Sequence, residues 1–270
     1  MKVTWEEPRW DDLGWERLAA GVGRCRLPVW DCTVGLVTGP GGALLIDAGS
    51  SLAEGARLRL EAQKLAGRRV DFVALTHPHF DHVFGAAAFA GAHVLAAEGT
   101  DGAGAGGAGG ATGGEFGRAG REALCADAVR NGLDVRAAEE AADTLVVPHR
   151  RIRADLTVDI ELGDGPKVLL RTVGPGHTRN DLVVVVPGAD DGDDPTVVFC
   201  GDLVEESGEP QAGPDAVPSH WPTALDRVLS LGGENALYVP GHGAVVDAAF
   251  VRAQRDTLAT RFGVSREPVD

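Results

Sequence analysis

The sequence is poor in cysteine and in basic side chains. Its four cysteines, Cys25, Cys32, Cys125 and Cys200, are scattered without a C-x-x-C pair, which argues against a disulfide framework and favours a reduced, cytoplasmic setting. The 25 lysines and arginines are outnumbered by 40 acidic residues, so the net charge is −15. Because binding to nucleic acid and to anionic lipid depends on lysine and arginine, we expect neither partner.

Long apolar runs are also missing. No stretch approaches the roughly 20 apolar residues of a membrane-spanning helix. The segment MKVTWEEPRWDDLGWERL has no apolar core of the kind found in secretory signals. We therefore expect no membrane association. A chain of 270 residues with 44% hydrophobic content can bury the core of one large domain, and we predict a single domain over residues 1–270.

Short apolar runs alternate with helix-like stretches along the chain. Helices are predicted at residues 51–67, 82–91, 221–233 and 247–263, the first capped by Ser50 or Ser51 and the third by Ser219. Strands are predicted at residues 28–39, 42–49, 68–76, 92–97, 151–162, 167–174, 181–188, 196–202 and 235–243. This alternation predicts an α/β fold.

Glycine is concentrated in residues 98–120, where it occupies about every second position. The tract contains Gly104-x-Gly106-x-x-Gly109, formally a dinucleotide fingerprint. Such a match arises easily in a low-complexity segment, and no acidic ribose partner closes a βαβ unit after it. We interpret the tract, at about 99–120, as a flexible surface loop, with residues 99–114 the most mobile part of the chain.

Three of the eight histidines fall within the seven residues THPHFDH, at 76–82. Pro78 keeps this segment from becoming helical, so His77 and His79 can point the same way. Asp81 and His82 follow at the expected start of a helix, where the backbone turns. The segment is either a polar surface loop or a metal site.

Three further residues of the metal-binding type occupy a similar setting. His177, Asp202 and His242 each follow a predicted strand and lie beside glycine, which permits close backbone approach. The other histidines, His93, His149 and His220, are expected to have structural or solvent-exposed roles, with His220 the best candidate for an exception. The repeated strand-end placement favours the metal site.

The motifs LLIDAG, THPHFDH, GPGHT, FCGD and VPGHG resemble, in order and spacing, those of the metallo-β-lactamase-fold hydrolases. The resemblance implies a four-layer αβ/βα sandwich of two mixed sheets flanked by helices. It also implies that one metal is held by His77, His79 and His177, a second by Asp81, His82 and His242, with Asp202 bridging both. Asp47 resembles the family's acidic residue that contacts a metal ligand from behind. The alternative interpretation is that Asp47 is only a turn residue at the end of a strand.

The implied cofactors are two divalent metal ions, for which imidazole and carboxylate ligands suit zinc and also iron or manganese. A metal-bridging hydroxide would attack a small ester, thioester, lactone or amide, and Asp81 would orient this nucleophile and shuttle its proton. The alternative is a mononuclear iron dioxygenase of the persulfide type on the same scaffold. Under both hypotheses, hydrolase and dioxygenase, we expect a small-molecule substrate.

Three differences from the family's motifs argue against particular branches of the family. Val83, Phe84 and Gly85 follow His82 where glyoxalase-II-type thioesterases have x-Gly-Gly, which weakens that assignment. His79 replaces the glutamate of the flavodiiron branch, and Asp202 replaces the cysteine of many true β-lactamases. Cys200 is expected to face the core or flank the site rather than bind metal.

Overall fold

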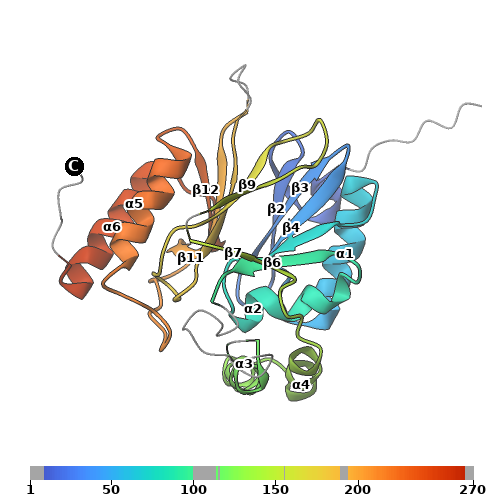
Figure 1. Cartoon of the computed structure of the whole chain (residues 1–270), viewed down its shortest axis with the longest axis horizontal. Coiled ribbons are helices and arrows are strands. Elements are labelled where there is room, and N and C mark those ends of the chain that lie inside the picture. The colour runs from blue at the N-terminus through green and yellow to red at the C-terminus, as the bar shows by residue number, and fades with distance from the viewer. Residues whose placement is uncertain (1–8, 100–113, 115, 155, 189–193, 265–270) are drawn as a thin grey trace, which may run out of the picture.

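A computed structural model describes residues 9–99, 114, 116–154, 156–188 and 194–264. Two mixed β-sheets pack face to face, and helices cover the outer face of each sheet, so the chain forms four layers (Figure 1). The α/β sandwich predicted from the sequence is therefore confirmed.

The first sheet has seven strands in sequential order. They are β1 (Glu16–Ala19), β2 (Val22–Arg26), β3 (Thr33–Gly39), β4 (Gly42–Ile46), β5 (Phe72–Ala74), β6 (His93–Ala97) and β7 (Arg150–Ile152). β1 to β4 pair antiparallel, and β4 to β7 pair parallel. The parallel half brings the carboxyl ends of β4, β5 and β6 to one edge of the sheet.

The second sheet has five strands in the order β12-β11-β10-β9-β8. They are β8 (Thr157–Ile160), β9 (Val168–Thr172), β10 (Leu182–Val186), β11 (Val197–Glu205) and β12 (Leu237–His242). β11 and β12 are parallel, so their carboxyl ends also lie together.

Helices cover the outer face of each sheet. The first sheet is covered by α1 (Leu52–Ala66), with α2 (Phe80–Val83) and the 3-10 helices η1 (Asp11–Leu13) and η2 (Phe84–Ala88) nearby. The helices α3 (Arg118–Arg130) and α4 (Val135–Asp143) lie below them in Figure 1 and pack against each other and against α2, η2 and α1. The second sheet is covered by α5 (Trp221–Gly232) and α6 (Ala248–Phe262).

Side-chain alternation in the strands divides the core into three layers. In β10, Leu182, Val184 and Val186 face the other sheet, whereas Val183 and Val185 pack against α5 and α6. A strand covered on both faces is apolar throughout, which explains the continuous run LVVVV. Burial of each such side chain stabilises the fold by roughly 1.5–3 kcal/mol.

The predicted ends of α1 are confirmed. The Ser51 hydroxyl accepts a hydrogen bond from the Glu54 amide at 3.2 Å, and the Glu54 carboxylate accepts one from the Ser50 amide at 2.8 Å. The helix ends at Gly67, which adopts the left-handed region with φ 65°. The Ser219 cap predicted for α5 is wrong: His220 is the N-cap residue, without a side-chain capping bond, and Pro222 lies in the first turn.

Two other expectations differ from the structure. The single strand predicted at residues 151–162 is two strands, β7 and β8, which belong to different sheets. A turn closed by a hydrogen bond from the Leu156 amide to the Arg153 carbonyl separates them. The pattern of apolar residues in the sequence does not predict this turn. The predicted loop at about 99–120 also extends too far, because α3 begins at Arg118. The mobility prediction for residues 99–114 falls on residues 100–113, outside the described part.

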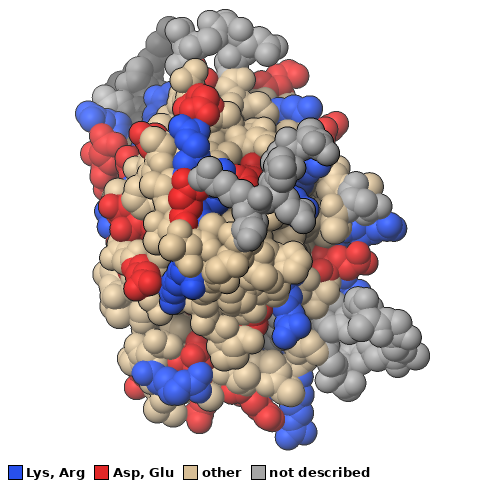
Figure 2. All heavy atoms as spheres, turned by 90° about the vertical axis from the view of Figure 1, so that its left-hand side faces the viewer, with Lys and Arg blue, Asp and Glu red and all other residues tan. Residues whose placement is uncertain are grey.

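Charged side chains of both signs are interspersed on the face formed by α5 and α6 (Figure 2). Some form ion pairs there, as Arg252 does with Glu234 at 2.6 Å and Arg255 with Asp226. Among the described residues there is no helix that is both long and apolar enough to cross a membrane.

A close backbone contact fixes η2 against α1 and the loop after β4. A Cβ at Gly85 would overlap the Ala48 carbonyl oxygen and lie 2.9 Å from the Gly55 Cα. We therefore expect Gly85→Ala to reduce the free energy of unfolding by about 1–3 kcal/mol, as overpacking does. Urea denaturation provides the measurement. Gly208→Ala is the control, since a Cβ there meets nothing within 4 Å. Equal midpoints for the two variants would contradict the prediction.

Candidate metal centre

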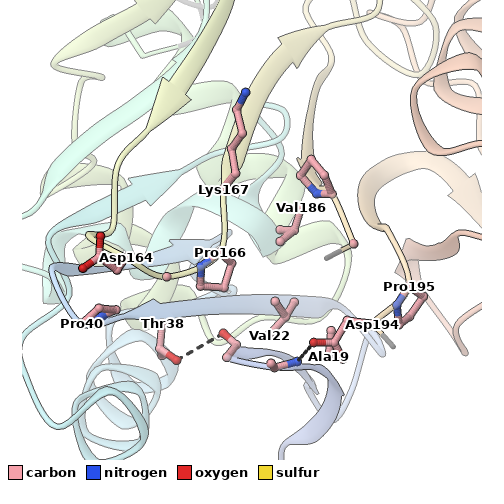
Figure 3. Close-up of a pocket in the computed structure, with 15 residues that line it drawn as sticks. Ala19, Val22, Thr38, Pro40, Asp164, Pro166, Lys167, Val186, Asp194 and Pro195 are labelled. Carbon is pink, nitrogen blue, oxygen red and sulfur yellow. Dashed lines mark hydrogen bonds between the residues drawn. The ribbon is translucent and has the colours of Figure 1, made fainter. Parts of the chain in front are cut away.

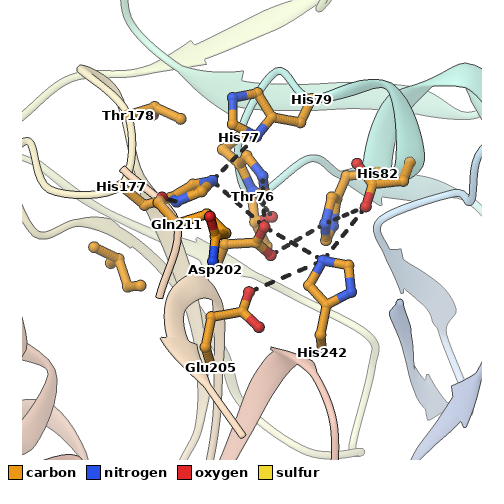
Figure 4. A network of polar contacts seen from close by, with 12 residues as sticks. Thr76, His77, His79, His82, His177, Thr178, Asp202, Glu205, Gln211 and His242 are labelled. Atoms are coloured by element: carbon orange, nitrogen blue, oxygen red, sulfur yellow. Dashed lines mark hydrogen bonds and ion pairs between the residues drawn. The ribbon is translucent and has the colours of Figure 1, made fainter. Parts of the chain in front are cut away.

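The carboxyl ends of β5, β9 and β12 meet at one place, together with Asp202 near the end of β11 (Figures 1 and 4). β5 leads into the histidine cluster, the loop between β9 and β10 carries His177, and β12 ends at His242. The structure brings together all seven residues predicted from the sequence: His77, His79, Asp81, His82, His177, Asp202 and His242.

One set of potential ligands consists of His77, His79, His177 and Asp202, whose ligand atoms all lie within 4.8 Å of one another. The His79 Nδ1 lies 3.0 Å from the His177 Nε2. The Asp202 Oδ2 lies 3.5 Å from the His77 Nε2 and 3.4 Å from the His177 Nε2. This spacing suits atoms that share one ion at about 2.0–2.2 Å each.

A second set lies on the other side of Asp202. The His82 Nε2 is 3.1 Å from the Asp202 Oδ1, and the His242 Nε2 is 3.3 Å from the Asp202 Oδ2. The Asp81 Oδ2 lies 3.3 Å from the His242 Nε2 and 3.6 Å from the His82 Nε2. The Asp202 carboxylate therefore stands between two sets of ligand atoms.

Hydrogen bonds on the outer side of the histidine rings determine which ring nitrogen points into the site. Four histidines direct Nε2 into the site and use Nδ1 for a partner outside it. These contacts are His77 with Thr76 Oγ1 at 2.9 Å, His82 with Asp47 Oδ2 at 2.9 Å, His177 with the Gln211 carbonyl at 3.1 Å and His242 with the Trp30 carbonyl at 2.7 Å. Such partners orient a metal-binding ring and select its tautomer.

His79 has the opposite orientation. Its Nε2 lies 3.0 Å from the Asp215 Oδ2, so Nδ1 faces the site. The pKa of Asp215 is lowered: burial would raise it, but the contact with His79 outweighs burial. Asp215 was not predicted from the sequence, because it lies in the long segment between β11 and α5, where no pattern distinguishes one acidic residue from another.

Asp47 has the backbone of a turn residue, and its side chain contacts His82, one of the predicted metal ligands. Its φ of 61° is the left-handed backbone of a turn directly after β4. Its Oδ1 accepts a hydrogen bond from the Thr76 amide and its Oδ2 accepts one from the Thr76 hydroxyl, both at 2.8 Å. Because Oδ2 also contacts His82, this buried carboxylate ties the end of β4 to the histidine cluster.

Burial and mutual charge give the site its protonation pattern. Burial lowers the pKa of His77 and that of His177 to about 3, which keeps both imidazoles neutral and able to bind metal. Burial alone would raise the pKa of Asp202, but the histidines around it, His82 and His242 foremost, hold that pKa well below its usual range. The same attraction outweighs burial at His242 and raises its pKa to about 10.

Two buried atoms at the centre have no hydrogen-bond partner, the Nε2 of His77 and the Oδ1 of Asp202. Buried polar atoms without partners are costly, and their presence between two histidine sets calls for an additional group. Imidazole nitrogens and a carboxylate are ligands that zinc, iron and manganese accept. The donor set therefore fits divalent metal ions.

Cys32 and Glu205 also border the site, and neither was predicted there from the sequence. The Cys32 Sγ lies 3.7 Å from the His82 Nδ1 and donates a hydrogen bond to the Asp81 carbonyl at 3.2 Å. Glu205 was missed because β11 was expected to end at Asp202, whereas it runs three residues further. The strand is irregular at Gly201, where φ is 55° and the register with β12 shifts.

The remaining predictions concern residues outside the cluster. Cys200 is buried in the core between the second sheet and the helices α5 and α6, which is the first of the two positions predicted for it, in the core or beside the site. His149 accepts a hydrogen bond from the Val94 amide at 3.0 Å, and the His93 ring lies beside that of Phe72. His220 is exposed at the start of α5, where its Nδ1 lies 3.1 Å from the Ser219 hydroxyl.

A separate cavity of about 580 Å³ lies at the opposite end of the sheets (Figure 3). It is lined by the turn between β1 and β2, the turn between β3 and β4, and the segments before β9 and β11. None of the residues predicted for the metal site lines it.

Comparison with solved structures shows the same fold. The metallo-β-lactamase FIM-1 of Pseudomonas aeruginosa, in its mono-zinc form, has a TM-score of 0.62 at 20% identity, covering 93% of this chain and 96% of the other. A metallo-β-lactamase of Pontibacter korlensis has a TM-score of 0.60 at 19% identity, with 90% and 97% covered. At these identities the likeness concerns the fold alone.

Comparison with curated proteins found no match. A family model does match, that of the metallo-β-lactamase superfamily, over residues 27–242. This range includes both sheets from β3 onward and every residue of the histidine and aspartate cluster. The chain belongs to the metallo-β-lactamase superfamily.

Proposed function

We propose that the protein is a dinuclear metal-dependent hydrolase that acts on a small ester, thioester, lactone or amide. The observation that carries this proposal is the position of the Asp202 carboxylate, which faces His77 and His177 on one side and His82 and His242 on the other. One carboxylate between two sets of imidazoles suits a bridging ligand.

In this proposal His77, His79 and His177 would hold one ion, Asp81, His82 and His242 would hold the other, and Asp202 would be a ligand of both. Zinc is the first candidate, with iron and manganese as alternatives. Two divalent ions there would supply a hydroxide at neutral pH and polarise the scissile carbonyl.

The chain itself contributes orientation and proton handling. The rings of His77 and His82 are almost completely buried and immobilised by Thr76 and Asp47, so they fix the geometry from behind. The side chains of Asp81 and His242 keep 11% and 13% of their surface exposed and that of His79 keeps 24%, so solvent reaches the site at these residues. Asp81 would orient the nucleophile and receive its proton at Oδ2.

A mononuclear iron dioxygenase remains the second candidate. The set formed by His77, His79, His177 and Asp202 is complete without the second set, so it could hold a single ion. Metal content and oxygen consumption separate the two functions.

Metal removal provides the test. We expect the purified protein to contain up to two divalent ions per chain and to hydrolyse at least one member of a panel of esters, thioesters, lactones and amides. Chelation should abolish hydrolysis and lower the melting temperature, because ions that bind only the folded state stabilise it, and zinc or manganese should restore both. One iron per chain, with oxygen consumed and no hydrolysis, would instead establish the dioxygenase.

A further inference from the structure

A buried glutamine of α6 is hydrogen-bonded to the part of β11 that carries Asp202. Gln254 is only 8% exposed, so its polar atoms need partners within the protein. Its Nε2 donates a hydrogen bond to the Leu203 carbonyl at 2.8 Å, and its Oε1 accepts one from the Glu205 amide at 3.0 Å. Because a carbonyl only accepts and an amide N–H only donates, these two partners determine the orientation of the side chain.

The pairing of β11 with β12 is irregular around Asp202. The register shifts between Gly201 and Glu205, so that residues 202–204 lie opposite a single residue of β12. A bulged stretch of this kind interrupts the regular ladder of hydrogen bonds, and its backbone groups need other partners. The side-chain amide of Gln254 supplies one donor and one acceptor there, as a peptide group of a neighbouring strand would.

The position of the Asp202 carboxylate depends on this stretch of backbone. Leu203, whose carbonyl Gln254 holds, directly follows Asp202 in the chain. A Cβ at Gly241 would overlap the Asp202 Oδ1, so the carboxylate lies close against β12. The same oxygen is 3.1 Å from the His82 Nε2. A small shift of β11 would therefore move a side chain that faces both histidine sets.

We propose that Gln254 is a positioning residue for the Asp202 carboxylate. By holding the main chain on the carboxyl side of Asp202, it sets the distance of that carboxylate from the two histidine sets. This inference rests on the proposed function, because it assumes that Asp202 is a ligand of both ions. Gln254 lies outside the residues 27–242 that match the family model, so the inference concerns a part of the chain that the family motifs do not include.

The test replaces Gln254 by methionine, which has a similar length and no amide. Gln254→Asn, which keeps an amide but is one methylene shorter, is measured beside it in case methionine prevents folding. Tyr238→Phe is the matched control, since it removes a hydrogen bond from the same core, that of the Tyr238 hydroxyl to the Gly233 carbonyl at 2.8 Å. We expect all three substitutions to lower the melting temperature by a few degrees, because each removes a hydrogen bond.

Two further measurements distinguish a positioning role from a structural one. Zinc dissociation constants are obtained by competition with a chelator, and the absorption spectrum of the cobalt-loaded protein reports the geometry of the ligands. We expect both Gln254 variants to bind zinc about tenfold more weakly than wild type and to change the cobalt spectrum, as loss of a group that orients a ligand does. Tyr238→Phe should leave both measurements unchanged.

The possible outcomes separate the inference from the proposed function. If the Gln254 variants lose stability but keep the zinc affinity and the cobalt spectrum of wild type, Gln254 has only a structural role and the inference is wrong, whereas the proposed function stands. Equal weakening of zinc binding in Tyr238→Phe would also overturn the inference, since any loss of stability would then reduce affinity. If wild type binds no metal, the proposed function itself fails.

Discussion

Replacing Asp202 by alanine should empty both halves of the metal site and abolish hydrolysis. Its Oδ1 lies 3.1 Å from the His82 Nε2, and its Oδ2 lies 3.4 Å from the His177 Nε2, so one side chain serves both histidine sets. Loss of a group that merely supports a ligand lowers metal affinity by about 10–100-fold, and loss of a bridging ligand should exceed that. We expect fewer than one ion per chain and a fall in kcat of at least about 100-fold.

Metal per chain and kcat on the best acyl substrate are measured on the same preparation. Asp159→Ala is the control, since that carboxylate is exposed and pairs only loosely with Lys167, at 3.7 Å. Retention of two ions with near-normal turnover would refute the bridging role of Asp202. Loss of one ion with the other kept would show that Asp202 is a ligand of one ion only.

Asp81→Asn should separate metal binding from proton transfer. The amide has the shape of the carboxylate and can still orient a water molecule, but it accepts no proton. The first set, His77, His79, His177 and Asp202, does not include Asp81 and should keep its ion. General-base assistance contributes about 10²–10⁴-fold, and we expect kcat to fall by that factor.

We expect Asp81→Asn to leave the local backbone structure unchanged. The Cys32 thiol donates to the main-chain carbonyl of Asp81, which the substitution leaves in place. Metal analysis, kcat and a melting curve of Asp81→Asn are compared with those of Asp159→Asn. Unchanged kcat would exclude Asp81 as the proton acceptor, and loss of both ions would show that it is mainly a ligand.

The histidine cluster could be predicted from sequence because its geometry is local. Pro78 keeps the segment extended, and α2 begins directly after His79, so the direction of each side chain follows from a few residues. The convergence of His177, Asp202 and His242 was predicted from their strand-end placement and from the spacing of motifs that resemble those of the metallo-β-lactamase-fold hydrolases. The metal-binding role of these residues remains a prediction.

Other features depend on contacts that no local pattern encodes. The sequence between residues 151 and 162 is apolar enough for one strand, but the turn at Arg153 and Leu156 sends its halves to different sheets. Glu205 borders the site because β11 continues past Asp202, beyond the irregularity at Gly201. Asp215 contacts His79 across 136 residues of sequence, a pairing fixed only by the folded chain.

The two ligand sets each combine residues from both sheets, and this has a consequence for how the molecule assembles. His79 and His177 lie 98 residues apart, and the isolated bridge between Cys32 and His242 joins the sheets at the same edge. Contacts of such separation form late, after the entropy of closing a long loop has been overcome. A bound ion would therefore connect the two sheets only after they have docked. The rate of metal uptake by refolding chains would then report the rate of that docking step.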